Sequence, residues 1–109
     1  MAELDPTRAS TTPVASISHE GETVVLRLAG ELDISTLQDA RRSADNLVEQ
    51  QPERVVVELG QLTFMDSSGI ALLLWIASKV PRVELRNPSP IIQQLIEMTG
   101  LNKTLPTTP

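Results

Sequence analysis

The run Val55–Leu59 (VVVEL) constrains the fold of this chain more than any other feature. Three of its five residues are β-branched and only one is polar, which is typical of a strand covered on at least one face. Helical patterns are predicted on both sides of it. A covered strand between helices indicates β-α-β crossovers, which place parallel strands in one sheet. The chain is therefore predicted to be an α/β protein.

Two strands are predicted ahead of the first helix. Val14–Ser18 alternates weakly between apolar and polar residues, whereas Thr23–Ala29 alternates well. His19–Glu22 contains a glycine and is predicted to turn, so the two strands should form an antiparallel hairpin. Gly30–Asp33 is predicted to end the second strand.

Two helices are predicted on either side of Val55–Leu59. The first is amphipathic and follows Ser35, whose spacing to Gln38 matches a capping box. The second spans residues 68–79 and contains the apolar run IALLLWIA, so we expect it to be largely buried. Ser67 or Ser68 is expected to cap it.

The remaining elements complete a single domain. Val83–Arg86 reads as a strand, and a last helix begins after Ser89, with proline at its first position, and ends at Gly100. The predicted order is β-β-α-β-α-β-α, a mixed sheet with an N-terminal hairpin. We expect residues 13–105 to form the domain, with residues 1–12 and 106–109 as disordered tails because both are rich in small polar residues and proline.

Composition excludes several classes of function. The 109 residues contain no cysteine and one histidine, which argues against a thiolate or histidine metal site, and we expect no metal and no cofactor. A net charge of −5 and 2% aromatic residues argue against nucleic acid as a partner. No apolar run approaches the roughly 20 residues that span a bilayer, so no membrane insertion is expected. The polar N-terminus does not look like a signal peptide, and we expect a cytoplasmic protein.

Three motifs carry a resemblance to a known family. They are Gly-Glu-Leu-Asp33 after one strand, Phe64-Met-Asp-Ser-Ser-Gly69 after another, and the segment Pro90–Leu101. Together they resemble the STAS domains of bacterial anti-anti-sigma factors, also called anti-sigma factor antagonists, over roughly residues 14–105. Two features depart from the family pattern: a short link between the apolar helix and Val83, and the early end of the chain after Leu105.

The resemblance implies a phosphorylation switch and no enzymatic activity. It assigns the phosphorylated serine to Ser67, modified by an anti-sigma factor that is itself an ATP-dependent serine kinase and restored by a serine phosphatase. The unphosphorylated form would bind the anti-sigma factor and release the sigma factor. It also implies a partner-binding surface at Asp33, Met65, Asp66, Ser67, Ser68 and Gly69.

Each of these residues also has a simpler structural interpretation. Ser67 could serve only as a helix cap, and Asp33 and Asp66 could form turns. Alternatively, the two aspartates could help to hold Mg²⁺ or orient the serine while it sits in the kinase site. Gly69 could allow a partner to approach closely or only permit a tight turn. Met65 could edge a docking surface or lie partly buried at the end of its strand.

Two other functions compete with the switch. One is a STAS adaptor subunit that regulates a lipid-transport ABC ATPase without being phosphorylated. The other is a small serine hydrolase, which we disfavour because Asp-Ser-Ser-Gly is not a nucleophile elbow and His19 lies far away in sequence.

Overall fold

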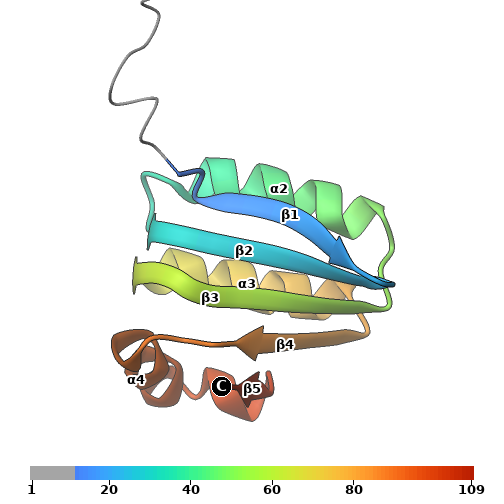
Figure 1. Ribbon diagram of the computed structural model, residues 1–109. Helices are drawn as coiled ribbons and strands as arrows, with labels where there is room; N and C mark the ends of the chain where they lie inside the picture. Colours follow the sequence, from blue (N-terminus) through green and yellow to red (C-terminus); the bar gives the residue numbers. More distant parts are fainter. Residues whose placement is uncertain (1–11) are drawn as a thin grey trace, which may run out of the picture.

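The computed structural model describes residues 12–109 of the chain. Its elements are β1 (Ala15–Glu20), β2 (Thr23–Leu32), α2 (Leu37–Glu49), β3 (Arg54–Met65), α3 (Ser67–Lys79), β4 (Arg82–Arg86), α4 (Pro90–Thr99), the 3-10 helix η1 (Leu101–Lys103) and β5 (Thr107–Thr108). The predicted order of strands and helices is confirmed, and η1 and β5 are added to it (Figure 1). None of the helices in this described part is long and apolar enough to cross a membrane.

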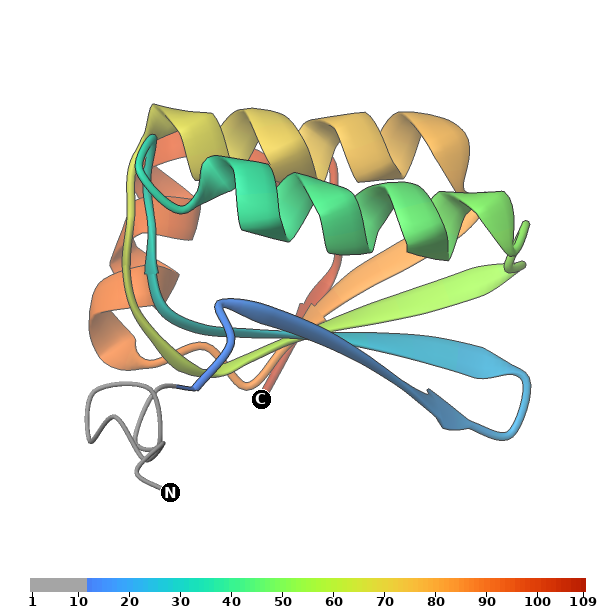
Figure 2. The same ribbon diagram turned by 90° about the horizontal axis from the view of Figure 1, so that it is seen from above.

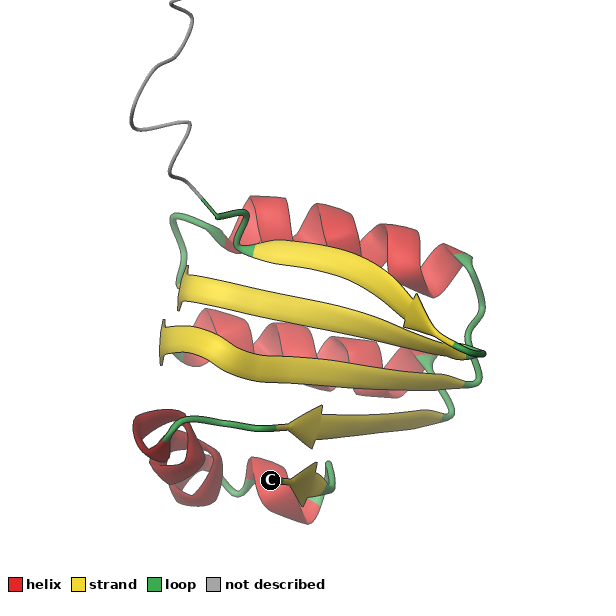
Figure 3. Cartoon of the chain, viewed as in Figure 1, coloured by secondary structure: helices red, strands yellow, loops and turns green. Residues whose placement is uncertain are grey.

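The strands form one mixed sheet in the order β1-β2-β3-β4-β5. β1 is antiparallel to β2, and the other neighbours are parallel, so the predicted hairpin and crossovers are both present (Figure 3). The hairpin turns through Gly21, whose φ of 62° is in the left-handed region that glycine adopts without strain. β1 begins at Ala15, one residue later than the strand predicted from Val14. It also includes His19, which the sequence predicted to lie in the turn.

Both long strands continue past the points where the sequence predicted them to end. β2 runs on through Gly30 to Leu32, and β3 runs to Met65, because parallel pairing resumes after shifts of register on either side of Ala29 and Gly30. Gly30 has a φ of 77°, which accommodates the irregularity. Gly30, Glu31 and Leu32 therefore belong to β2, so the prediction that Gly30–Asp33 ends the strand was wrong for these three residues. Asp33 is the first residue after the strand. This extension carries both strand ends to the same edge of the sheet.

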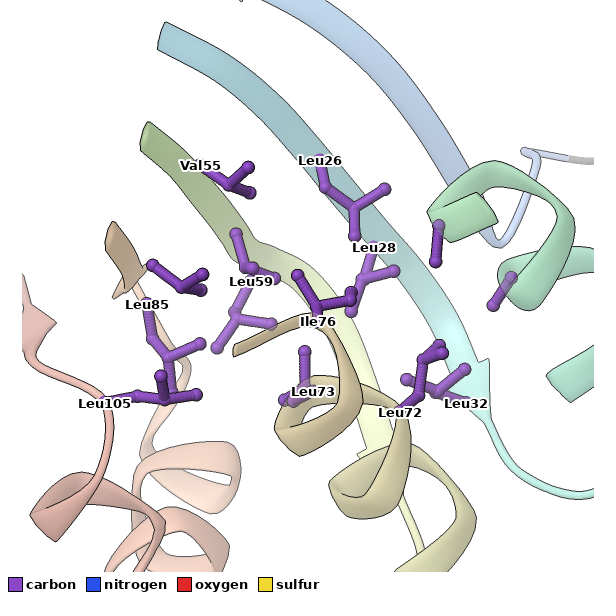
Figure 4. Packing of buried hydrophobic residues seen from close by; sticks show 14 of the residues in the cluster. Leu26, Leu28, Leu32, Val55, Leu59, Leu72, Leu73, Ile76, Leu85 and Leu105 are labelled. Atoms are coloured by element: carbon purple, nitrogen blue, oxygen red, sulfur yellow. The ribbon is translucent and has the colours of Figure 1, made fainter. Parts of the chain in front are cut away.

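The core lies between the sheet and the helices α2 and α3, which run side by side along one face (Figure 2). Leu72, Leu73 and Ile76 of α3 point at the buried leucines of β2 and β3 (Figure 4). α3 is less buried than its composition suggested, because Leu74 on its other side is 41% exposed. The prediction of a largely buried helix therefore holds for one face only.

The opposite face of the sheet carries charged side chains. Arg86 on β4 donates to Glu58 on β3 over 2.8 Å and to Glu20 on β1 over 3.2 Å. Burial raises the pKa of Glu58, but hydrogen bonds from Arg86, Asn87 and the Gly60 N–H outweigh it, so the net pKa lies below the usual 4.5. The hydrogen bond from Arg86 likewise lowers the pKa of Glu20. These ion pairs tie three strands together across the face.

The C-terminal tail was predicted to be disordered, and this was wrong. Thr107 and Thr108 form β5, which pairs in parallel with Leu85 and Arg86 of β4. The Asn87 N–H also donates to the Thr108 carbonyl over 2.9 Å. Backbone hydrogen bonds of this kind need no sequence pattern, so the segment's polar composition did not reveal them. The predicted N-terminal tail, residues 1–12, lies outside the described residues except for Thr12.

Candidate functional site

The two motifs meet at the carboxyl ends of β2 and β3. Leu32 pairs with Met65 in the parallel ladder, and the Asp66 N–H donates to the Leu32 carbonyl over 3.2 Å. Asp33 and Asp66 are the next residues on the two strands, so both loops lie side by side below the first turns of α2 and α3 (Figure 2). Carboxyl ends of parallel strands are a common place for functional sites in open α/β sheets.

Asp66 caps α3. Its backbone is extended, its Oδ1 accepts the Ser68 N–H over 2.8 Å, and its carbonyl accepts the N–H groups of Gly69 and Ile70. The bonds from the Ser68 and Gly69 N–H groups satisfy donors that the helix itself leaves without partners. The cap is therefore the aspartate, and the prediction that Ser67 or Ser68 fills this role was wrong.

Ser67 is the first residue of α3 and is exposed to solvent. Within the described part of the chain its hydroxyl forms no hydrogen bond, because Asp66 already caps the helix. Its hydroxyl is thus accessible and uncommitted. Ser68 is only partly exposed, and its N–H is held by Asp66.

Asp33 organises the other loop. Its Oδ1 accepts hydrogen bonds from the Ser35 hydroxyl over 2.6 Å and from the N–H groups of Ser35 and Thr36. The hydrogen bond from Ser35 is the main cause that lowers the pKa of Asp33 below its usual 3.8. Thr36 is the N-cap residue of α2, and its hydroxyl donates to the Glu31 carbonyl instead of capping the helix. The capping box from Ser35 to Gln38 was therefore wrong, and both aspartates form turns as one interpretation proposed.

Met65 and Gly69 are buried beneath the two loops of the site. Met65 is 2% exposed, and Gly69 is buried against it. A methyl group at Gly69 would lie 2.5 Å from Met65 Cγ and 2.9 Å from Leu32 Cδ2. Gly69 thus permits α3 to approach the chain's own strands, whereas Met65, although nearly buried, lines an apolar hollow beside Ser67. That these two residues belong to a partner-binding surface stays a prediction.

The possible metal ligands and the one histidine of the chain were located relative to Ser67. No group of three or more possible metal-binding side chains occurs among residues 12–109. His19 pairs with Val24 at the opposite end of β2 from Leu32, and its ring bonds to Gln50. With a rise of about 3.3 Å per residue, eight residues of strand separate the two ends by about 26 Å. The histidine is too far away to act as a base for Ser67.

Sequence reasoning missed one part of this region. Leu74 on α3 and Leu95 on α4 line an apolar hollow that opens beside Asp66 and Ser67. The signal was present in α4, where Ile91, Leu95 and Met98 are spaced as one helical face distinct from the buried face.

Known proteins resemble the chain in both sequence and fold. The family model described as "Mlab, STAS domain" matches residues 15–107. An anti-sigma F factor antagonist of Paenibacillus polymyxa is 33% identical over 95 residues, which cover 83% of this chain and 81% of that protein. The chain belongs to the STAS-domain family.

Solved structures share the fold. An anti-sigma factor antagonist from Mycobacterium paratuberculosis superimposes with a TM-score of 0.82 at 23% identity, covering 87% of this chain and 84% of that one. The anti-sigma factor antagonist SpoIIAA in its unphosphorylated form gives a TM-score of 0.62 at 30% identity, covering 77% and 82%. The Bacillus SpoIIAA in its phosphorylated form gives 0.64 at 29% identity, covering 85% and 89%. The predicted mixed α/β fold of the STAS type is therefore confirmed.

Proposed function

We propose that this protein is an anti-sigma factor antagonist switched by phosphorylation of Ser67. In the unphosphorylated form it binds an anti-sigma factor that is also an ATP-dependent serine kinase, and the sigma factor is released. The kinase transfers the γ-phosphoryl group of ATP to the Ser67 hydroxyl, leaving ADP, and a serine phosphatase removes the group by hydrolysis. The protein acts by binding and has no catalytic role of its own.

The exposed, uncommitted hydroxyl of Ser67 carries this proposal. A kinase must reach the serine oxygen without first breaking bonds that hold the fold, and Asp66 rather than Ser67 caps the helix. The relatives supply the second support, because they are anti-sigma factor antagonists and one is known in a phosphorylated form.

The electrostatics explain how phosphorylation blocks binding without refolding the domain. A phosphoserine carries about −1.5 to −2 charges near neutral pH. The amino end of α3 favours an anion by about 0.3–1 kcal/mol, whereas the carboxylate of Asp66 opposes it. A partner seated over Ser67 would have to desolvate the phosphate, at a cost of several kcal/mol. The switch is therefore expected to act by direct obstruction.

The test compares Ser67 variants against the purified anti-sigma factor of the same organism, with binding measured by calorimetry. Ser67→Ala should bind as the wild type does, whereas Ser67→Asp should raise Kd by at least about 100-fold, which corresponds to nearly 3 kcal/mol. ATP with the kinase should phosphorylate a peptide containing Ser67, detected by mass spectrometry. Ser68→Ala is the matched control and should still be phosphorylated at Ser67.

Tight binding by Ser67→Asp together with no binding by Ser67→Ala would refute the switch. A STAS adaptor of a lipid-transport ABC ATPase is the second candidate, because only Val80 and Pro81 separate α3 from β4, a departure from the antagonist pattern. For that function, an ABC ATPase should co-purify with the protein, and its binding should not change in any Ser67 variant.

A further inference from the structure

An apolar hollow lies directly beside Ser67, between α3 and α4. Its volume is about 340 Å³. Ile70 and Leu74 of α3 and Leu95 and Thr99 of α4 line its sides, and Asp66 and Ser67 stand at its rim. No part of the described chain fills it.

The helix faces around this hollow are apolar, and their side chains are left exposed or only partly buried by the core. Leu74 is 41% exposed, and Met98, close to Leu95 on α4, is 76% exposed. The inner face of α4 is already occupied by Ile92 and Ile96, both completely buried. Contiguous apolar groups that remain exposed after the core is filled are typical of a protein interaction surface.

The charges beside the hollow restrict what can occupy it. The two strand-end loops, residues 31–36 and 64–68, carry Glu31, Asp33 and Asp66 as their charged residues, and all three are acidic. An occupant that brings basic side chains to this rim is attracted, whereas one that brings acidic groups is repelled. A second copy of this chain docked symmetrically would bring its own carboxylates to the same rim. Charge complementarity therefore favours a different, basic partner.

We propose that this hollow receives an apolar segment of the anti-sigma factor, and that an arginine or lysine next to that segment pairs with Asp66. The proposal rests on the proposed function and specifies where the partner's anchor residue sits. It also explains why a single phosphoryl group suffices to dissociate the complex. The group on Ser67 would lie at the mouth of the hollow, beside Asp66, where the partner's apolar anchor must enter.

The test replaces Leu74 by glutamate and compares it with Ser78→Glu, which adds the same charge one turn further along α3, at an exposed position that does not line the hollow. Both variants should keep the wild-type circular dichroism spectrum, because both side chains are exposed. With the purified anti-sigma factor, Leu74→Glu should raise Kd by at least about thirty-fold, the loss expected at an interface anchor. Ser78→Glu should change Kd by less than about three-fold, as expected of surface outside the anchor site.

A third variant tests the basic contact. Asp66→Asn keeps an oxygen that can cap α3 but removes the charge, so it should weaken binding about ten-fold and reduce the dependence of Kd on salt. If Leu74→Glu fails to fold, Leu74→Ser serves in its place, with a smaller loss of affinity expected.

The outcomes separate the two proposals. Equal affinities for Leu74→Glu and Ser78→Glu, with Ser67→Asp still unable to bind, would overturn the hollow as a docking site while the switch stands. Unchanged salt dependence in Asp66→Asn would overturn the basic contact. If the wild type binds no anti-sigma factor, both proposals fall.

Discussion

Replacing Gly69 by alanine tests how closely α3 approaches the strands that carry the site. In an exposed helix this change stabilises the protein by about 1 kcal/mol, because glycine is the poorer helix former. Here the added methyl would lie 2.5 Å from Met65 Cγ and 2.9 Å from Leu32 Cδ2. Leu32 is completely buried and Met65 is 2% exposed, so neither can move away into solvent.

Overpacking of a filled core costs about 1–3 kcal/mol. After the gain in helix propensity is subtracted, we expect Gly69→Ala to lower the free energy of unfolding by up to about 2 kcal/mol. For a domain of this size the midpoint of thermal unfolding should fall by roughly 4–8 °C for each kcal/mol. Urea unfolding followed by circular dichroism measures the first quantity, and a thermal scan measures the second.

A double-mutant cycle with Met65→Ala identifies the cause. Met65→Ala removes the Cγ atom nearest to the new methyl, so the double variant should be more stable than the sum of the two single effects predicts. An increase in stability for Gly69→Ala alone, as helix propensity predicts, would refute the close approach. Strict additivity in the cycle would show that the clash lies elsewhere.

Two further predictions concern the cap of α3 and the charged face of the sheet. Asp66→Ala should lower the free energy of unfolding by about 1 kcal/mol in urea titrations, whereas Asp66→Asn should cost much less. Ser89→Ala on α4 is the comparison and should cost less than Asp66→Ala, because its cap bond is longer, at 3.4 Å against 2.8 Å; the reverse order would contradict the assigned cap. Because the folded pKa of Glu58 is lowered, its carboxylate stabilises the fold above the unfolded value of 4.5, and this contribution is lost as pH falls through the folded pKa. Glu58→Gln should therefore be less stable than the wild type by about 1–3 kcal/mol at pH 7, and the difference should shrink in urea titrations below pH 4.5. A difference that stays constant with pH would refute the role of the Glu58 charge.

The elements were predictable wherever one local signal dominated. Ser89, Pro90 and Gly100 start and end α4 as expected, because capping and backbone preferences act within a few residues. The buried strand Val55–Leu59 and the hairpin were likewise evident from side-chain pattern. The ends of elements were harder to predict where pairing with another strand decides them. Gly30 in β2 and the short strand β5 are the two examples.

The residues of the candidate site were named from the sequence, whereas their arrangement came from the structure. The motif identified Ser67, Asp33 and Asp66, and the structure brings all three to one edge of the sheet. Sequence could not distinguish Asp66 from the serines as the cap, because each of these side chains can accept the same N–H. Nor could it separate buried Met65 from exposed Ser67, two residues apart in one motif.

By itself, the sequence determined the order of strands and helices and the chemical groups at the two strand ends, because these depend on short-range patterns and on residue type. The tertiary structure alone decided which groups reach solvent. Parallel pairing of Leu32 with Met65 joins two loops that are 33 residues apart, and the seating of α3 and α4 leaves Leu74 uncovered beside Ser67. Accessibility depends on contacts between distant segments, and no local pattern encodes those contacts.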